Sequence, residues 1–412
     1  MKLLLLPAYF FPELVSDTPL DDARYDAFSK AGIEMALYTS VPTRSVSEED
    51  KIKYSKIRYQ EMYNGMMKVH RFGMIDEGKN PIGRAFRYFL CFIKQLWFGL
   101  KENNVDCIFV ISTPPIQGML AAFLKNRKKC KFVYNLQDIF PDTLVGAGMA
   151  QKDGMLWKIG RWIEDYTYRN ADKIIVISNE FKRNIMEKGV PEHKTEIVYN
   201  WVDQNAIVPI DDKDNPLFEE FGISRDKFRV VYAGNLGNAQ NLNIIIMAAE
   251  KLKKQDNIEF VIFGKGGMED DLRAEVAQKG LNNVKILPLQ PYERVSYVYS
   301  LGNVCLVSCK AGFGGSALPS KTWSILSAGR PVIASFDEGE LKYTIEKNKI
   351  GVFTKSDNVD DFVSGVLSLA ENPSLCEEMG KRGREYVLDN LTKEVGTARY
   401  TEIIKNVINE RC

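Results

Sequence analysis

The stretch that decides the fold is NVCLVSCKAGFGGSALPSKTWSILSAGRPVIAS, residues 303–335. Its first part, NVCLVS (303–308), is a continuous apolar run, which is typical of a strand covered on both faces. A glycine-rich loop follows, then a short apolar-periodic run that ends at Gly329, then a second apolar run at 331–335. This pattern predicts two parallel strands joined by a helix, with a ligand-binding loop after the first strand.

The same alternation of strands and helices extends over the whole chain. In the first half, the expected strands lie at 3–6, 33–39, 67–72, 105–111, 131–136, 172–177 and 195–200. In the second half, they lie at 228–233, 258–264, 284–287, 303–308, 331–335 and 350–354. Two such series predict two doubly wound α/β domains of the Rossmann type.

The chain length and the linker composition place the domain boundaries. A length of 412 residues suits two domains. We expect a Rossmann-like domain over 1–203, a linker over 204–227 that is rich in Pro, Asp and Asn, and a second Rossmann-like domain over 228–385. The last segment, 386–412, reads as a helix with no strand after it.

Composition excludes several classes of function. A net charge of +1 gives no global field for nucleic acid, and two histidines make a histidine-rich metal site improbable. Seven cysteines without a C-x-x-C pair favour a reducing, cytoplasmic setting. The apolar start MKLLLLP is too short for a signal-peptide core, and no run of 18 apolar residues occurs. The D-x-D at Asp212–Asp214 falls in the linker, so we expect neither an obligatory metal nor a cofactor.

The loop after the strand at 303–308 carries the clearest chemical signal. Gly312, Gly314 and Gly315 would let backbone N–H groups approach a ligand closely. Lys321 stands in the first turn of the following helix, where the helix dipole disfavours a positive charge unless an anion is present. The pattern therefore indicates a phosphate site. The alternative is a tight turn with a solvated lysine.

A second glycine loop, AGNLGNAQNL (233–242), follows the strand at 228–233. Gly234 again permits close approach, and the neutral side chains of Asn235 and Gln240 can hydrogen-bond phosphate oxygens or a sugar. Capping of the next helix explains the same residues equally well.

A third loop, FGKGGMEDDL (263–272), includes Gly264 and Lys265. Such a loop could receive a base or a ribose, although a plain turn accounts for its glycines without any ligand.

In the first half, YNLQDIFPDTL (134–144) continues past the end of a strand. Asp138 is expected to project from that strand end into a ligand site. Asp142 is expected to cap the following helix.

A basic and aromatic segment covers residues 79–101. It carries Lys79, Arg84, Arg87, Lys94 and Lys101 without any acid, interleaved with six aromatic side chains, and a second basic run lies at 125–131. Such a surface suits an anionic membrane, because each basic residue close to it contributes about 1 kcal/mol of binding free energy. The alternative is a crossover helix buried on the sheet with a solvated rim.

Taken together, these motifs resemble those of the retaining nucleotide-sugar glycosyltransferases of family 4, which have the GT-B fold. The resemblance covers nearly the whole chain and is most like bacterial O-antigen and capsule transferases of the L-fucosamine transferase type. It rests on FPE (11–13), STPP (112–115), DIFPD (138–142), YNWVD (199–203), AGNLG (233–237), FGKGG (263–267) and LPSKTWSILSAGRPVIAS (318–335).

The resemblance implies two Rossmann-like domains facing a central cleft. It implies a cytoplasmic enzyme, peripheral to the inner face of the membrane, that moves a sugar with retention from a UDP-sugar to a lipid-linked acceptor in lipopolysaccharide O-antigen or capsule biosynthesis. An N-acetylated 6-deoxyhexosamine would fit this type. The donor would bind the second domain and the acceptor the first, and the last helix commonly crosses back to the first domain.

This sequence departs from the family pattern at charged positions. Ser316 and Ser324 stand where many members carry glutamates. Asn235 and Gln240 replace an Arg–Lys pair, and Gln137 replaces a histidine. The resemblance therefore leaves Lys321 as the main cation for the donor. The expected catalytic residues are Asp138 and Lys321, and the expected donor-binding residues are Gly234, Asn235, Gln240, Gly264, Lys265, Gly314, Gly315, Ser316, Ser320, Lys321 and Ser324.

Two alternative functions stay open at this point. A non-hydrolysing nucleotide-sugar epimerase could use the same two-domain cleft, but it needs two acid–base groups around the sugar. A non-catalytic nucleotide-sugar binding protein would explain the missing charged residues.

Overall fold

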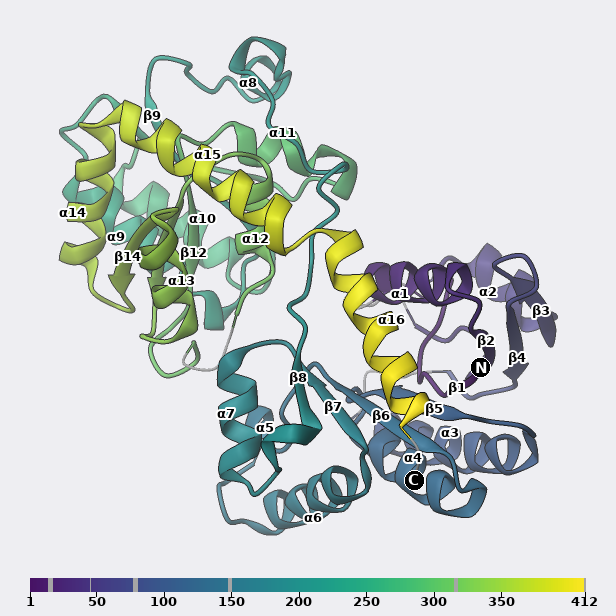
Figure 1. The fold of residues 1–412 in the computed structure, drawn as a ribbon. Helices are drawn as coiled ribbons and strands as arrows, with labels where there is room; N and C mark the ends of the chain where they lie inside the picture. The colour runs from purple at the N-terminus through teal and green to yellow at the C-terminus, as the bar shows by residue number, and fades with distance from the viewer. Residues whose placement is uncertain (14–17, 45, 77–80, 147–149, 315–317, 411–412) are drawn as a thin grey trace. The chain divides into compact units, whose positions relative to one another are not determined.

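The computed structural model describes residues 1–13, 18–44, 46–76, 81–146, 150–314 and 318–410 (Figure 1). The chain divides into two compact units. The first contains residues 1–199 together with 394–412, and the second contains residues 200–393. Each unit has one central sheet with helices on both faces, which confirms the predicted pair of doubly wound α/β domains.

The sheet of the first unit has eight strands in the order β3-β4-β2-β1-β5-β6-β7-β8. All neighbouring strands are parallel except β3, which pairs antiparallel with β4 at one edge. The strands are β1 (Lys2–Leu5), β2 (Glu34–Ser40), β3 (Tyr59–Met62), β4 (Met67–Phe72), β5 (Cys107–Ile111), β6 (Lys131–Leu136), β7 (Lys173–Val176) and β8 (Thr195–Ile197).

Helices cover both faces of this sheet. Those of the first unit are α1 (Thr18–Lys30), α2 (Glu48–Ser55), α3 (Pro81–Lys101), α4 (Ile116–Lys128), α5 (Asp142–Gly146), α6 (Met155–Asn170), α7 (Asn179–Glu187), the 3-10 turn η1 (Glu192–Lys194) and α16 (Lys393–Asn409). Side chains of α3, α4, α6 and α7 share one apolar cluster with the sheet. On the opposite face, Phe28 of α1 and Tyr400 of α16 both contact the ring of Phe109.

The sheet of the second unit has six parallel strands in the order β11-β10-β9-β12-β13-β14. The strands are β9 (Phe228–Asn235), β10 (Ile258–Lys265), β11 (Val284–Pro288), β12 (Val304–Ser308), β13 (Val332–Phe336) and β14 (Gly351–Lys355). The strand order reverses between β9 and β12, and ligands of such sheets bind outside the carboxyl ends of the strands at that point.

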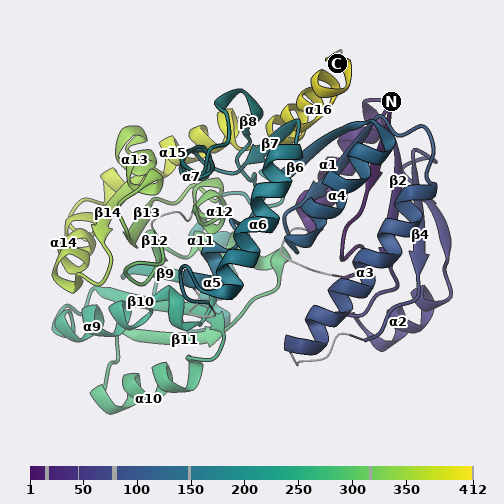
Figure 2. The same cartoon turned by 90° about the horizontal axis from the view of Figure 1, so that it is seen from below.

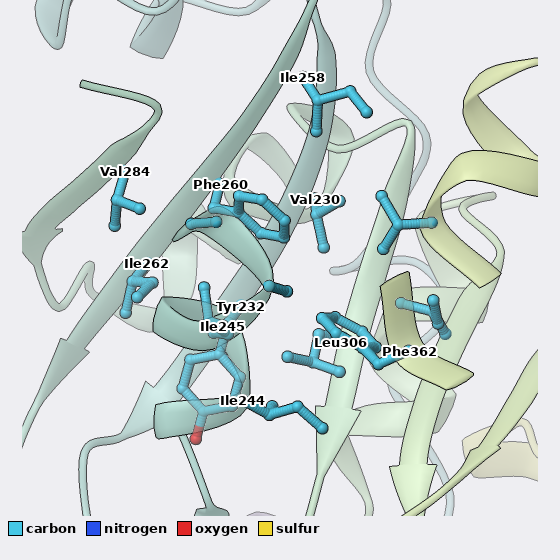
Figure 3. Packing of buried hydrophobic residues seen from close by; sticks show 14 of the residues in the cluster. Val230, Tyr232, Ile244, Ile245, Ile258, Phe260, Ile262, Val284, Leu306 and Phe362 are labelled. Atoms are coloured by element: carbon cyan, nitrogen blue, oxygen red, sulfur yellow. The ribbon is translucent and has the colours of Figure 1, made fainter. Parts of the chain in front are cut away.

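The helices of the second unit are α8 (Leu217–Glu220), α9 (Asn243–Lys251), α10 (Glu269–Lys279), α11 (Val295–Ser300), α12 (Lys321–Ser327), α13 (Glu340–Asn348), α14 (Val359–Ala370) and α15 (Pro373–Asn390). Three 3-10 turns accompany them: η2 (Asp212–Asp214), η3 (Asn238–Gln240) and η4 (Tyr292–Arg294). Figure 3 shows how β9, β10 and β12 pack against α9 and α14. Phe260, Leu306 and Phe362 belong to this core, and each is completely buried. Burial of such side chains contributes about 1.5–3 kcal/mol each to folding.

The segment expected to be a linker packs inside the second unit. Ile207, Leu217 and Phe218 are buried there. Asp212 of the D-x-D is not simply solvated, because its carboxylate lies 2.8 Å from Nη2 of the buried Arg229. The second unit thus begins at Asn200, well before β9.

The C-terminal segment contains two helices instead of one. Residues 386–390 complete α15, and α16 begins at Lys393. Tyr400 of α16 is fully buried in the first unit, and its hydroxyl donates a hydrogen bond of 2.9 Å to Asn135 Oδ1 at the end of β6.

Candidate functional site

The candidate donor site lies at the carboxyl ends of β9 and β12. Lys321 is the first residue of α12, and its Nζ donates a hydrogen bond of 3.1 Å to the hydroxyl of Tyr232. The ammonium stands 4.3 Å from the centroid of the Tyr232 ring. The Tyr232 hydroxyl in turn donates to the carbonyl oxygen of Asn235 at 2.8 Å. Strand β9 therefore holds the lysine that the sequence singled out.

Lys321 carries a charge that this surrounding does not neutralise. Burial lowers its pKa from 10.5 to about 8. Burial also raises the pKa of Tyr232, which stays a neutral phenol. Across the described ranges, no carboxylate forms an ion pair with Lys321. An anion bound here would therefore gain a strong partner.

Gly234 leaves the space that the lysine occupies. A Cβ atom on Gly234 would lie 2.9 Å from Lys321 Nζ, and its φ of +143° is one that side-chain-bearing residues rarely adopt. Neighbouring Gly264 on β10 is paired in register with Gly234. A Cβ on Gly264 would stand 2.6 Å from the Gly234 carbonyl oxygen. Both predicted glycines are thus required by close packing at the strand ends.

Asn235 and Gln240 come together over Gly237. The point where a Gly237 Cβ would stand is 2.7 Å from Asn235 Nδ2 and 2.8 Å from Gln240 Oε1. Gln240 Oε1 is buried and has no hydrogen-bond partner within the described part of the chain. It can therefore accept a hydrogen bond from a ligand hydroxyl or N–H group.

Asp337, which the sequence did not indicate, holds the glycine loop after β12 in place. The backbone N–H groups of Gly312 and Gly314 donate to Asp337 Oδ2 at 2.8 and 2.9 Å. The hydroxyl of Ser356 donates to Asp337 Oδ1 at 2.6 Å. In this conformation Asp337 therefore accepts the Gly314 N–H that the sequence assigns to the donor phosphate. Gly315 and Ser316 lie outside the described residues.

The remaining predicted donor residues lie at the same end of the sheet. Lys265 is exposed at the end of β10, beside Asn235 in the strand register. Ser320 is exposed just before α12 and makes no capping hydrogen bond, and Ser324 is half-buried within α12. Because α12 is only seven residues long, the positive charge of this site comes mainly from Lys321.

The predicted catalytic Asp138 belongs to the first unit. It is exposed just beyond β6, and its backbone N–H donates to Ser112 Oγ at 3.1 Å. The same oxygen accepts the N–H of Gln137 at 3.0 Å, and Gln137 Nε2 donates to Asn135 Oδ1 at 3.0 Å. Ser112 thus fixes the start of the loop that carries Asp138.

Asp142 does not act as the expected cap. It is the first residue of α5, and its carboxylate accepts from Asn184 Nδ2 at 3.2 Å and Lys188 Nζ at 2.8 Å. Its role is to join α5 to the chain around α7.

Glu13 and Arg87 form a buried polar cluster that was not expected. Glu13 accepts the N–H groups of Thr43 at 2.7 Å and Arg44 at 3.0 Å. Burial raises the pKa of Glu13 against the opposing effect of these hydrogen bonds. Arg87 Nε donates to Thr43 Oγ1 at 3.0 Å. Arg87 is therefore not part of a basic surface, and only the FPE segment signalled this cluster.

Within the ranges that the structure describes, no group of three or more His, Cys, Asp or Glu side chains could hold a metal ion.

Replacing Asp337 tests its role in fastening the glycine loop. Asp337→Ala removes the acceptor for two backbone N–H groups, so we expect the free energy of unfolding to fall by about 1–2 kcal/mol. Hydrogen exchange at the Gly312 and Gly314 amides should become faster. Glu338→Ala is the matched control, because the exposed side chain of Glu338 pairs with Lys342 at the surface. Unchanged exchange in Asp337→Ala would contradict this role.

Comparison with solved structures shows the fold. Sucrose-phosphate synthase of Thermosynechococcus elongatus aligns with a TM-score of 0.78 at 15% identity, covering 100% of both chains. HepE of Anabaena, solved in complex with UDP, aligns with a TM-score of 0.72 at 14% identity, covering 98% of this chain and 100% of HepE. These likenesses define the class: the two units have the GT-B fold.

Family models then assign the chain within this class. The model "Glycosyltransferase Family 4" matches residues 25–206, and "Glycosyl transferases group 1" matches residues 214–386. The protein is therefore a glycosyltransferase, and it belongs to the GT-B superfamily that combines these two domains.

Curated relatives agree with this assignment. WcaI of Escherichia coli K12, named as a glycosyl transferase of colanic acid biosynthesis, is 28% identical over 64% of this chain and 67% of its own length. The glycosyltransferase WbjE of Pseudomonas aeruginosa is 23% identical over 66% of each chain. The uncharacterized glycosyltransferase MJ1069 of Methanocaldococcus jannaschii is 20% identical over 99% of each.

Proposed function

We propose that the protein transfers a sugar from a UDP-sugar to a lipid-linked saccharide acceptor of a surface polysaccharide, an O-antigen or capsule, with retention of the anomeric configuration. The transfer takes place at the cytoplasmic face of the membrane. An N-acetylated 6-deoxyhexosamine is the proposed sugar, following the resemblance to L-fucosamine transferases.

The observation that carries the proposal is the ammonium group of Lys321. It lies where the strand order reverses between β9 and β12, and no carboxylate of the described residues pairs with it. The departing nucleoside diphosphate gains negative charge as its bond to the sugar breaks. A fixed cation beside it stabilises that charge more in the transition state than in the ground state. Lys321 is held for this by Tyr232 and by the space at Gly234.

Neutral groups complete the proposed donor site. Gln240 Oε1 is a buried acceptor without a partner among the described residues, and Asn235 lies beside it. We assign them to hydrogen bonds with the donor, together with Gly264, Lys265, Ser320 and Ser324. The choice of UDP is supported by the complex of HepE with UDP, a protein of the same fold. Neither a metal nor a further cofactor takes part in this proposal.

Asp138 is assigned to the acceptor. Its position beyond β6, fixed through Ser112, would let its carboxylate orient an acceptor hydroxyl. That hydroxyl attacks the anomeric carbon on the face from which the diphosphate leaves, and its proton passes to the leaving phosphate oxygen. The polysaccharide assignment is supported by the likeness to WcaI, named for colanic acid biosynthesis.

A panel of nucleotide sugars tests this proposal. We expect a UDP-sugar at 100 times its Kd to raise the free energy of unfolding by about 2.7 kcal/mol. GDP- and dTDP-sugars at the same concentration should raise it less. Transfer should then require a lipid-linked acceptor. Interconversion of UDP-sugars without any acceptor would indicate an epimerase instead, and tight binding without transfer to any acceptor would indicate a binding protein. Absence of stabilisation by every nucleotide sugar would contradict the proposal.

A further inference from the structure

Helix α3 presents an apolar stripe to solvent. Phe86, Phe89, Ile93, Trp97 and Leu100 are all large, apolar and exposed, with Trp97 at 52%. With 3.6 residues per turn, these positions fall on one side of the helix. The opposite side carries the buried residues Arg87, Cys91 and Gln95. The stripe therefore points away from the sheet and is not a misassigned part of the core.

Helix α6 presents a second stripe of the same kind. Met155 is 80% exposed, Trp162 is 59% exposed, and Ile159 lies between them on the same side of the helix. The buried side of α6 carries Gly160, Glu164 and others, as the helix packs onto the unit. A shallow pocket of about 450 Å³ is lined by Met155, Lys158, Ile159 and Trp162.

The two stripes belong to the same side of the first unit. Helix α4 lies between α3 and α6 and packs against both (Figure 2). All three helices cover one face of the sheet and share its core. Phe123 of α4 is exposed as well. We call the exposed apolar residues of α3, α4 and α6 the three-helix face.

Basic side chains accompany this face. Lys101 of α3, Arg127 of α4, Lys129 at its end and Lys158 of α6 are exposed. Lys101 Nζ stands 3.4 Å from the centroid of the Trp97 ring, and the Arg127 guanidinium lies 5.4 Å from that of Phe123. Between Arg84 and Lys101, α3 has no acidic residue.

The acidic groups of α6 do not cancel this charge. Glu164 is buried, and it accepts hydrogen bonds from Lys188 and from the hydroxyl of Tyr168. Asp165 is paired with Arg161 at 2.6 Å.

We infer that the three-helix face docks the first unit on the surface of an anionic lipid bilayer, with Trp97 and Trp162 inserted at the level of the headgroups. Exposed apolar patches of this kind mark interaction sites. Aromatic rings are favoured at the membrane interface, and basic residues are attracted to anionic headgroups. A bilayer meets both requirements at once. Among the described helices, none has the length and apolar run needed to span a membrane.

This inference deepens the proposed function. Membrane docking would bring the proposed acceptor-binding unit close to a lipid-linked acceptor, so its biological purpose rests on that proposal. Its test needs no donor, acceptor or turnover, so the two proposals can fail separately. Binding is measured by co-sedimentation with vesicles of phosphatidylcholine containing phosphatidylglycerol, and with vesicles of phosphatidylcholine alone. Quenching of tryptophan fluorescence by brominated lipid reports insertion.

We expect the wild type to bind the anionic vesicles, less tightly at high salt. Trp97→Ser with Trp162→Ser should lower the partition coefficient at least about tenfold and remove most of the quenching. Arg127→Gln with Lys129→Gln should weaken binding to anionic vesicles and flatten its salt dependence. Ile52→Ser with Tyr343→Ser is the matched control, because these side chains are 58% and 61% exposed elsewhere.

Two results would overturn the inference. One is equal vesicle binding by the tryptophan variant and the wild type. The other is a lipid-free wild-type dimer that the tryptophan variant dissociates, since this face would then bind a second copy of the chain.

Discussion

Lys321→Met is expected to lower kcat/KM for the nucleotide-sugar donor by about 10²–10³-fold, the effect typical of removing one preorganised group that stabilises transition-state charge. Methionine fills a similar volume, so the loss comes from the charge. In the wild type, kcat/KM for the donor should fall above a pH of about 8, because the free enzyme then loses the Lys321 proton. The variant should lack this alkaline limb.

The same substitution is expected to stabilise the fold by about 1–2 kcal/mol, as often found when a strained functional group is removed. The sign follows from the lowered pKa: the unfolded chain holds the lysine proton more tightly than the folded protein does. The folded state therefore bears the full cost of the charge below a pH of about 8. That cost shrinks as the pH rises toward 10.5, so the advantage of the variant should shrink over the same window.

Lys381→Met serves as the control for this experiment. Lys381 is exposed on α15, and its replacement should alter neither donor kinetics nor stability by more than about 0.5 kcal/mol. A Lys321→Met enzyme that keeps wild-type kcat/KM would rule out Lys321 as the cation for the diphosphate.

Gly266→Ala is expected to destabilise the second unit by about 1–3 kcal/mol, the usual cost of overpacking. The added Cβ would lie 2.5 Å from the carbonyl oxygen of Leu236 and 2.7 Å from its backbone nitrogen. Backbone atoms cannot move aside as a flexible side chain can. The loop after β9, with Asn235 and Gln240, must therefore shift, and KM for the donor should rise.

Gly267→Ala provides the matched control one residue further on. A Cβ at Gly267 would meet nothing within 4 Å, so denaturant unfolding should show little change in stability. If the two alanine variants unfolded at the same denaturant concentration, the close approach of Gly266 to Leu236 would not matter for the fold.

The sequence predicts the sheets well because their strands are continuous apolar runs. Strands covered by helices on both faces are apolar throughout, without the alternation of polar and apolar residues seen in half-exposed strands. The missed strand is β3, whose sequence YQEM is mostly polar and whose residues are exposed or half-buried at the sheet edge. Such an edge strand depends on its neighbour β4 more than on its own composition.

The sequence points to the candidate site where a residue type is unfavourable for its local secondary structure. Lys321 in a first helical turn is such a case. Asp337 was not predictable, because its contact with Gly312 and Gly314 depends on β12 and β13 being neighbours in the sheet. Tyr232 is part of an apolar strand, and its hydroxyl gains a role only once Lys321 lies beside it.

Arg87 shows the opposite error. Composition groups Arg87 with the basic residues of 79–101, but helical periodicity places it on the buried side of α3, as it does Cys91. The aromatic residues of the same segment divide in the same way, and the exposed ones form the stripe of the three-helix face.

Calorimetric titration of UDP into the wild type and into Lys321→Met tests the central claim most directly, because UDP carries the diphosphate without the sugar or the acceptor. The account predicts that the wild type binds UDP and that the variant binds it about 10²-fold more weakly. Equal dissociation constants for the two proteins would contradict it.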